Sequence, residues 1–95
     1  MLIRIVHMTF QPDKVPEFLA LFEASKPMVR HFTGCHHLEL WQDQNDENKF
    51  MTYSHWDSEA ALNRYRDSEL FAGIWKQTKA LFSDKPRAYS LESVA

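Results

Sequence analysis

The beginning of the chain is apolar at nearly every position. In an extended chain one face would carry Leu2, Val6, Met8 and Phe10, and the other would carry Ile3 and Ile5. Because both faces then require burial, the pattern predicts a strand over residues 2–10 that is packed on two sides.

From Val15 onwards the apolar residues recur three or four positions apart, which predicts a helix. They are Val15, Phe18, Leu19, Phe22 and Val29. Pro16 falls in the first turn, where proline is tolerated. Pro27 falls in the interior, where it removes the hydrogen bond to the carbonyl of Glu23, so we expect a kink or an early stop there.

Gly34 ends this segment, and residues 35–42 are typical of a second strand. The polar run 43–48 predicts a solvated turn. Beyond the turn, Phe50–Trp56 alternates small polar side chains with large ones, which suits a pleated surface. The two strands and the turn together predict a β-hairpin.

A helix start follows this strand immediately, because Asp57 or Ser58 can cap a short helix. Ser68 can cap a second helix, whose core-facing positions again show helical spacing. In the first helix these positions are Ala61, Leu62 and Tyr65, and in the second they are Phe71, Ile74, Trp75, Thr78, Leu81 and Phe82. We expect Pro86 to stop the second helix and residues 87–91 to form the last strand.

The predicted order is strand, helix, strand, strand, helix pair, strand. It is the split βαβ order of ferredoxin-like α+β domains, in which helices cover one face of a four-stranded antiparallel sheet. The other face is left bare, yet the first strand is apolar on both sides. A homodimer packed sheet on sheet is the simplest way to cover it.

The composition is that of one folded domain over residues 1–95, with 44% hydrophobic and 14% aromatic residues. A net charge of −2 with scattered Lys and Arg makes nucleic acid a poor partner. No apolar run approaches the roughly 20 residues that cross a bilayer, so no membrane partner is expected. Cys35 has no second cysteine to pair with, and we expect a cytoplasmic protein.

Several segments resemble the antibiotic biosynthesis monooxygenase (ABM) domains, a family of dimeric α/β barrels. The likeness lies in the first strand, the first helix, the turn before Cys35, the end of the third strand and the loop into the last helix. These segments are Ile3–Phe10, Val15–Phe22, Phe32–Cys35, Tyr53–Ala60 and Ser68–Phe71. Together they span nearly the whole chain.

The resemblance implies oxygen chemistry without a bound flavin or metal. In the monooxygenase branch an electron-rich phenolic or polyketide substrate is deprotonated in an apolar pocket and then reacts directly with oxygen. Related members degrade haem or act on quinols or signalling metabolites, so the family fixes the scaffold more firmly than the reaction.

The chain departs from the family pattern at four positions. Ser54 stands where the family often has Glu, and Tyr65 stands where many members have His. Trp75 occupies the position of the haem-ligating His, and indole nitrogen only donates. His7 replaces the small polar residue that haem degraders place late in the first strand. These differences weaken the haem-degrading interpretation.

By alternation, Thr52, Ser54 and Trp56 share one face of the third strand, and the resemblance places that face beneath the helices. Small Thr52 and Ser54 would leave room there for a substrate pocket. We expect His7 to lie on the neighbouring face of the first strand and to serve as the general base, since imidazole titrates near neutral pH. A packed core or dimer-edge histidine is the alternative.

Three aromatic residues, Trp56, Tyr65 and Trp75, are expected to hold the substrate ring, although each also suits the core. Met51, Tyr53 and His55 would then face the dimer partner. Metal binding by the consecutive residues 35–37 is not expected, because adjacent strand residues point to opposite faces.

The function predicted from the sequence is therefore a cofactor-independent monooxygenase acting on an aromatic, polyketide or quinol-like small molecule. The alternative is a binding or regulatory dimer of the same fold without catalysis, which the missing strand-three carboxylate favours. Haem binding or degradation is a third hypothesis, which the sequence supports less than the other two.

Overall fold

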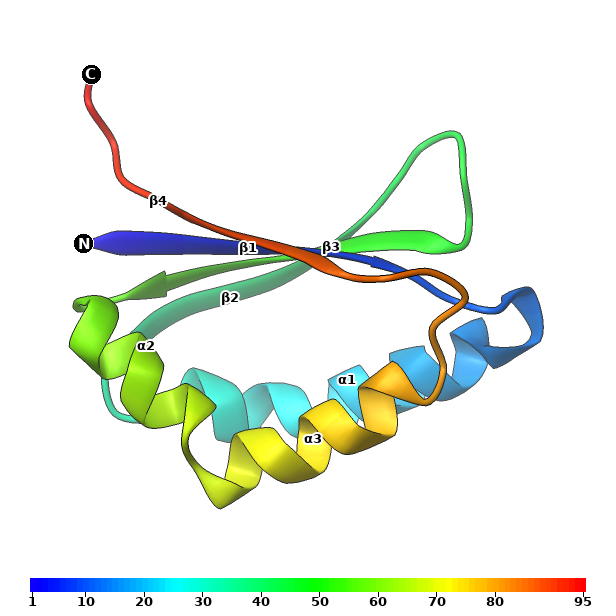
Figure 1. The fold of residues 1–95 in the computed structure, drawn as a ribbon, viewed down its shortest axis with the longest axis horizontal. Helices are drawn as coiled ribbons and strands as arrows, with labels where there is room; N and C mark the ends of the chain where they lie inside the picture. Colours follow the sequence, from blue (N-terminus) through cyan, green and yellow to red (C-terminus); the bar gives the residue numbers. More distant parts are fainter.

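The computed structural model describes residues 1–95 as one sheet with helices on a single face (Figure 1). The strands are β1 (Leu2–Thr9), β2 (Cys35–Gln42), β3 (Lys49–Trp56) and β4 (Arg87–Leu91). The helices are the short 3₁₀ helix η1 (Pro12–Lys14), α1 (Val15–Arg30), α2 (Glu59–Arg66) and α3 (Glu69–Lys79). This is the predicted ferredoxin-like α+β arrangement.

The sheet has the strand order β2-β3-β1-β4, and every neighbouring pair is antiparallel. At its centre Ile5 of β1 lies opposite Tyr53 of β3 on one side and Tyr89 of β4 on the other. Val6 lies opposite Thr52, one position on and therefore on the other face. The register thus separates a helix-covered face from an open face.

The open face carries both apolar residues and polar or charged ones. Its members are Ile3, Ile5 and His7 on β1, His37, Glu39 and Trp41 on β2, Met51, Tyr53 and His55 on β3, and Arg87, Tyr89 and Leu91 on β4. Trp41, Tyr89 and Leu91 are exposed there. No helix in the structure has both the length and the apolar character needed to cross a membrane.

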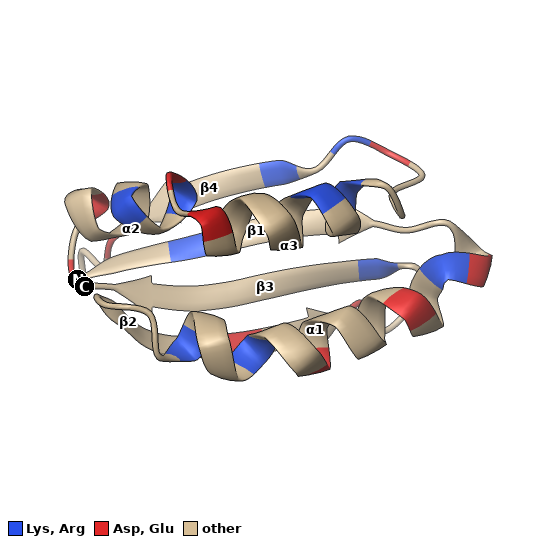
Figure 2. Cartoon of the chain, turned by 90° about the horizontal axis from the view of Figure 1, so that it is seen from below, with Lys and Arg blue, Asp and Glu red and all other residues tan.

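Figure 2 shows α1 on one side and α2 with α3 on the other, in front of the sheet. Charged residues spread over the helices and are few on the strands. Beneath the helices one core cluster consists of Met8, Phe10, Phe18, Phe50 and Leu81, and a second consists of Cys35, Trp56 and Leu62.

Serine residues begin both of the later helices, as the sequence predicts. The Ser58 hydroxyl accepts from the backbone N–H of Ala61 at the start of α2, and the Ser68 hydroxyl accepts from that of Phe71 at the start of α3. Each bond satisfies one of the N–H groups left without a partner in a first helical turn.

The two expected helix ends differ in the structure. Of the kink or early stop expected at Pro27, the stop does not occur: α1 continues to Arg30, because proline removes a single hydrogen bond from a helix held by its buried face. Helix α3 ends at Lys79, well before Pro86. Phe82, expected on that helix, instead bridges to Phe10, and this pairing anchors the chain before β4.

The turn between α1 and β2 depends on Gly34, whose φ is +92°. A Cβ atom at this position would lie 2.7 Å from Cβ of Ala61 in α2. The turn therefore needs glycine both for its backbone conformation and for the close approach of α2.

We predict that Gly34→Ala lowers the free energy of unfolding by about 1–3 kcal/mol, through strain and the forced contact with Ala61. Urea unfolding measures the change. Gly73→Ala is the matched control, because a Cβ there meets nothing within 4 Å, and in a helix it should stabilise by about 0.5–1 kcal/mol. Equal effects of the two changes would contradict the role given to Gly34.

Candidate functional site

A cavity of about 310 Å³ lies between the helices and the covered face of the sheet. It reaches both core clusters, since Met8 and Phe18 line it together with Trp56 and Leu62. Most of its wall is apolar. Its polar or charged lining side chains, apart from the two indole groups, are Arg4, Ser25, Lys26, Thr52, Ser54, Tyr65, Arg66 and Thr78.

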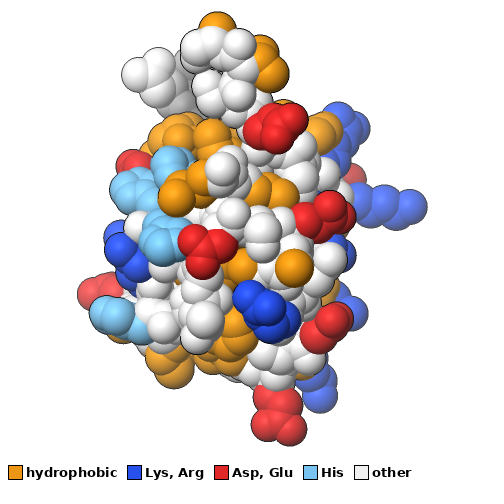
Figure 3. Space-filling model, turned by 90° about the vertical axis from the view of Figure 1, so that its left-hand side faces the viewer, with side chains coloured by type: hydrophobic (Ala, Val, Ile, Leu, Met, Phe, Trp, Pro, Cys, Tyr) orange, Lys and Arg blue, Asp and Glu red, His pale blue; other side chains and the backbone are white.

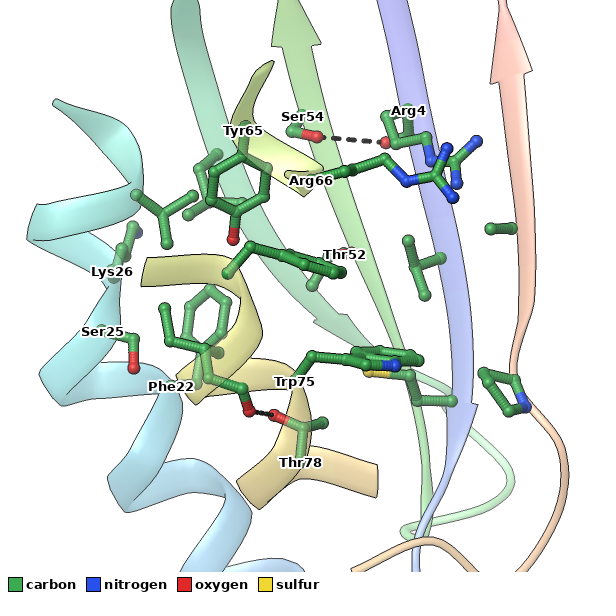
Figure 4. A pocket seen from close by; sticks show the side chains of 18 of the residues that line it. Arg4, Phe22, Ser25, Lys26, Thr52, Ser54, Tyr65, Arg66, Trp75 and Thr78 are labelled. Atoms are coloured by element: carbon green, nitrogen blue, oxygen red, sulfur yellow. Dashed lines mark hydrogen bonds between the residues drawn. The ribbon is translucent and has the colours of Figure 1, made fainter. Parts of the chain in front are cut away.

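The cavity brings together five of the six residues predicted for the site. Thr52, Ser54 and Trp56 enter from β3, Tyr65 from α2 and Trp75 from α3 (Figure 4). The alternation of β3 and the helical spacing of α2 and α3 explain this convergence.

Ser54 and Trp56 are bound to each other at one end of the cavity. The Trp56 indole nitrogen donates to the Ser54 hydroxyl at 3.0 Å, and that hydroxyl lies 3.4 Å from the backbone carbonyl of Arg4. Both side chains are buried, with Trp56 only 1% exposed. The hydrogen-bonding groups of these two residues are therefore occupied within the protein.

Tyr65 presents its hydroxyl to the cavity (Figure 4). Its ring stacks on Trp56 with the ring centroids 4.9 Å apart and meets Phe32 and Phe71 edge to face. Burial, with a smaller contribution from nearby Cys35, raises the pKa of Tyr65 to about 12. Tyr65 thus keeps its proton at neutral pH and acts as a hydrogen-bond donor, not as a base.

Trp75 forms another part of the aromatic wall. Its ring stacks on Phe71 with centroids 5.8 Å apart and contacts Phe82 edge to face. None of the hydrogen bonds within the chain involves its indole nitrogen, so this donor is available to a bound molecule. An indole in this place cannot ligate a haem iron.

The predicted position of His7 is wrong. His7 lies opposite Met51 and Arg87 on the open face, whereas Val6 and Met8 face the cavity. His7 is exposed and contacts Tyr89 edge to face. Because a shift of one residue along a strand reverses the face, His7 cannot share the cavity with Thr52 and Ser54, and we assign it no role as a base there.

The sequence interpretation missed three cationic residues of the lining. Arg4 alternates with Leu2 and Val6, so its place on the covered face was available from the strand pattern. Lys26 and Arg66 extend from α1 and α2, where helix periodicity gave no comparable signal. The lining contains neither a carboxylate nor an imidazole group.

The remaining histidines gather at one end of the molecule, as Figure 3 shows. The ring centroids of His37 and His55 lie 5.2 Å apart, but His37 bonds to Glu39 while His36 bonds to Asp57. The side chains of residues 35–37 therefore diverge. Cys35 is buried beside them, and burial raises the pKa of its thiol, which leaves it protonated and unreactive.

Fold and cavity together define a class, the small ferredoxin-like α+β domains that enclose an apolar pocket between one sheet and its helices. Comparison with known proteins identifies the family. Residues 1–77 match the model of the antibiotic biosynthesis monooxygenase (ABM) family. The chain belongs to this family.

Solved structures share the fold over the full length of the chain. A crystal structure of an antibiotic biosynthesis monooxygenase matches with a TM-score of 0.93 and 22% identity, covering 100% of both chains. PA3566 from Pseudomonas aeruginosa matches with a TM-score of 0.86 and 26% identity, covering 99% of this chain and 94% of that one.

Among curated proteins, the uncharacterized protein sll1783 from Synechocystis sp. is 26% identical over 85 residues. The match covers 90% of this chain but only 57% of that protein. The chain therefore spans a little over half the length of this relative.

We predict that Tyr65 ionises near pH 12, about two units above an ordinary tyrosine. Between those values the unfolded state loses the proton that the folded state retains. The stability that Tyr65 contributes is therefore complete below about pH 10 and is lost as the pH rises through about 12.

The ultraviolet absorbance of tyrosinate, followed against pH in the wild type and in Tyr65→Phe, isolates this ionisation as a difference. Tyr89→Phe is the matched control, because it removes a tyrosine that is 46% exposed on the open face. Ionisation of Tyr65 near pH 10 would show that its environment is wetter than the structure indicates.

Proposed function

We propose that this protein binds an electron-rich aromatic, polyketide or quinol-like molecule in the cavity and promotes its oxidation by molecular oxygen. The observation that carries the proposal is the cavity itself, a mostly apolar space of about 310 Å³ whose lining includes Trp56, Tyr65 and Trp75. Such a site suits a flat ring system that carries one or two oxygen substituents.

Each of the five predicted residues that line the cavity has a part in this proposal. Trp75 supplies a flat surface against the ring, Trp56 supports Tyr65 from behind by stacking on it, and small Thr52 and Ser54 leave room above the sheet. Because Ser54 is bound to Trp56, its contribution is space and not proton transfer. The Tyr65 hydroxyl donates a hydrogen bond to a ring oxygen and stabilises negative charge that develops there.

The proposed reaction needs no electron-carrying cofactor, because the substrate supplies every electron. An activated ring methylene loses both hydrogens and becomes a carbonyl. One atom of the oxygen molecule ends in that carbonyl, and the other leaves as water with the two hydrogens. A quinol that becomes a hydroxyquinone follows the same balance.

The lining offers no carboxylate or imidazole to accept the first proton. We therefore assign that proton to water at the mouth of the cavity, and the substrate anion, once formed, transfers an electron to oxygen. The protein accelerates the reaction by holding the ring and stabilising its anion. The rate should consequently rise with pH along the ionisation of the substrate and not along that of a histidine.

We predict oxygen consumption and the matching quinone or hydroxyquinone when metal-free protein is mixed with a panel of hydroxyanthrones and quinols. Trp75→Leu should lower kcat/KM about tenfold or more, through lost ring contact. His7→Ala is the matched control and should leave kcat/KM and its pH profile unchanged. Neither uptake nor binding across the panel would end the proposal, and a pH profile that changes in His7→Ala would restore the histidine as base.

A non-catalytic binding protein of the same fold is the second candidate. It is favoured by one observation, that no acid–base group lines the cavity beyond Tyr65 and the cations. Calorimetric binding of the same compounds under anaerobic conditions, without oxygen uptake in air, would select this function. Neither candidate requires haem, since Trp75 provides no ligand for iron.

We also propose that the open sheet face joins two copies of the chain into a homodimer. Ile5 at the centre of that face, flanked by Tyr53 and Tyr89, supports this proposal, as do the exposed Trp41 and Leu91. Exposed large apolar side chains gathered on one sheet face are uncommon on a monomer.

We predict that Ile5→Lys shifts the protein toward monomer, because it places a charge in the middle of the joined surfaces. Sedimentation velocity at several concentrations measures the change. Ala24→Lys, on an exposed position of α1, adds the same charge away from the sheet and should leave the mass unchanged. A wild type that stays monomeric at high concentration would refute the dimer.

A further inference from the structure

The cavity contains a feature that the proposed oxidation does not require, a cationic corner with no carboxylate among the lining residues. Arg4 on β1 and Arg66 at the end of α2 both line it, and Figure 4 shows their guanidinium groups directed to the same side. We propose that this corner binds an anionic group of the ligand, so that the molecule in the cavity is an aromatic acid. This inference rests on cavity binding under the proposed function and narrows its substrate class.

Arg4 lies on the covered face of the sheet beneath the helices. Its backbone carbonyl faces Ser54, and its side chain donates a single hydrogen bond, at 3.0 Å, to the hydroxyl of Ser90 on the neighbouring strand. A guanidinium has five N–H donors in a planar fork. Most of the donors of Arg4 therefore have no partner within the protein.

Arg66 brings a second positive charge to the same corner. Both guanidinium groups lie on the same side of the cavity in Figure 4. In keeping with that placement, burial and then repulsion from Arg66 lower the pKa of Arg4. Lys26 lines the cavity from α1 as a third cation. None of the three forms an ion pair, since the only salt bridges of the chain are His36 with Asp57 and His37 with Glu39.

A purely structural role does not account for this arrangement. Arg66 is exposed in the last turn of α2, where a positive charge complements the helix dipole, but that role sets no direction for its guanidinium group. Here two guanidinium groups converge on a mostly apolar cavity in a chain whose net charge is −2. An anionic oxygen between them would relieve their repulsion and accept paired hydrogen bonds, the geometry in which arginine binds carboxylates and phosphates most strongly.

The ring and the acid group then have separate places. The ring contacts the aromatic wall of Tyr65 and Trp75, and the acid group reaches the corner beside β4. A carboxylate and a phosphate monoester share the chemistry required there, and they are distinguished by experiment.

Isothermal titration calorimetry of the wild type with naphthoate, naphthyl phosphate and neutral naphthamide tests the inference. We expect at least one of the two anions to bind about tenfold or more tightly than the amide, as charge-assisted hydrogen bonds predict. The tighter of the two anions identifies the group. Added salt should weaken the binding of the anion and leave that of the amide nearly unchanged.

Arg66→Gln should reduce the affinity for the preferred anion about tenfold while the amide is unaffected. Arg66 is exposed, so its loss does not threaten folding, and Arg4→Gln provides the second measurement. Arg64→Gln is the matched control, because Arg64 is exposed on the same helix but does not line the cavity.

The outcomes separate the two proposals. An amide that binds as well as both anions overturns the acid-binding corner and leaves the proposed oxidation intact. Equal losses in Arg64→Gln and Arg66→Gln also overturn it, because the effect would then be one of general charge. If none of the three compounds binds, cavity binding fails for this ring class and the acid-binding corner fails with it.

Discussion

The register between β1 and β3 is the constraint on which the rest of the structure depends. By setting Val6 opposite Thr52 and Ile5 opposite Tyr53, it decides for every residue of the sheet which face it occupies. A slip of one position would exchange the two faces completely. The pairing is secured at its ends by Trp56 opposite Leu2 and by Phe50 opposite Met8, whose large side chains fit only beneath the helices.

Given that register, the cavity follows from side-chain size. The middle of β3 presents Thr52 and Ser54 to helices whose facing positions hold long aromatic residues, and the large side chains of the two core clusters hold sheet and helices apart on either side. The hydrogen bond from Trp56 to Ser54 fixes the wall at one end. Space remains above the small side chains of β3, and Tyr65 and Trp75 enclose that space.

The sequence predicted the fold well because its signals are local. The bounds of β2 and β4 match the predicted strands, and Ser58 and Ser68 cap the helices as expected. The early stop at Pro27 was wrong because the apolar face of α1 outweighs one lost hydrogen bond. Phe82 was misplaced because its partner, Phe10, is distant in sequence, and such a pairing leaves no periodic signal.

The site was predicted less completely. Strand alternation and helical spacing located Thr52, Ser54, Trp56, Tyr65 and Trp75, but the same alternation, applied to β1, would have excluded His7 and included Arg4. His7 was predicted because histidine is a common general base, although the alternation along the strand decides which face a residue occupies. Arg66 and Lys26 extend from exposed helix positions, and only the three-dimensional arrangement reveals that both line the cavity.

A pocket without a proton acceptor of its own has a consequence for how such a protein diverges. If the reactivity resides in the bound molecule, a new specificity requires no new catalytic residues. It requires only different side chains lining the cavity. Exchanges of the side chains of Thr52, Ile74 or Ala88, which line the cavity, would reshape what fits inside while the backbone pairing of the sheet persists. One scaffold can thereby serve many unrelated molecules, each selected by outline and charge.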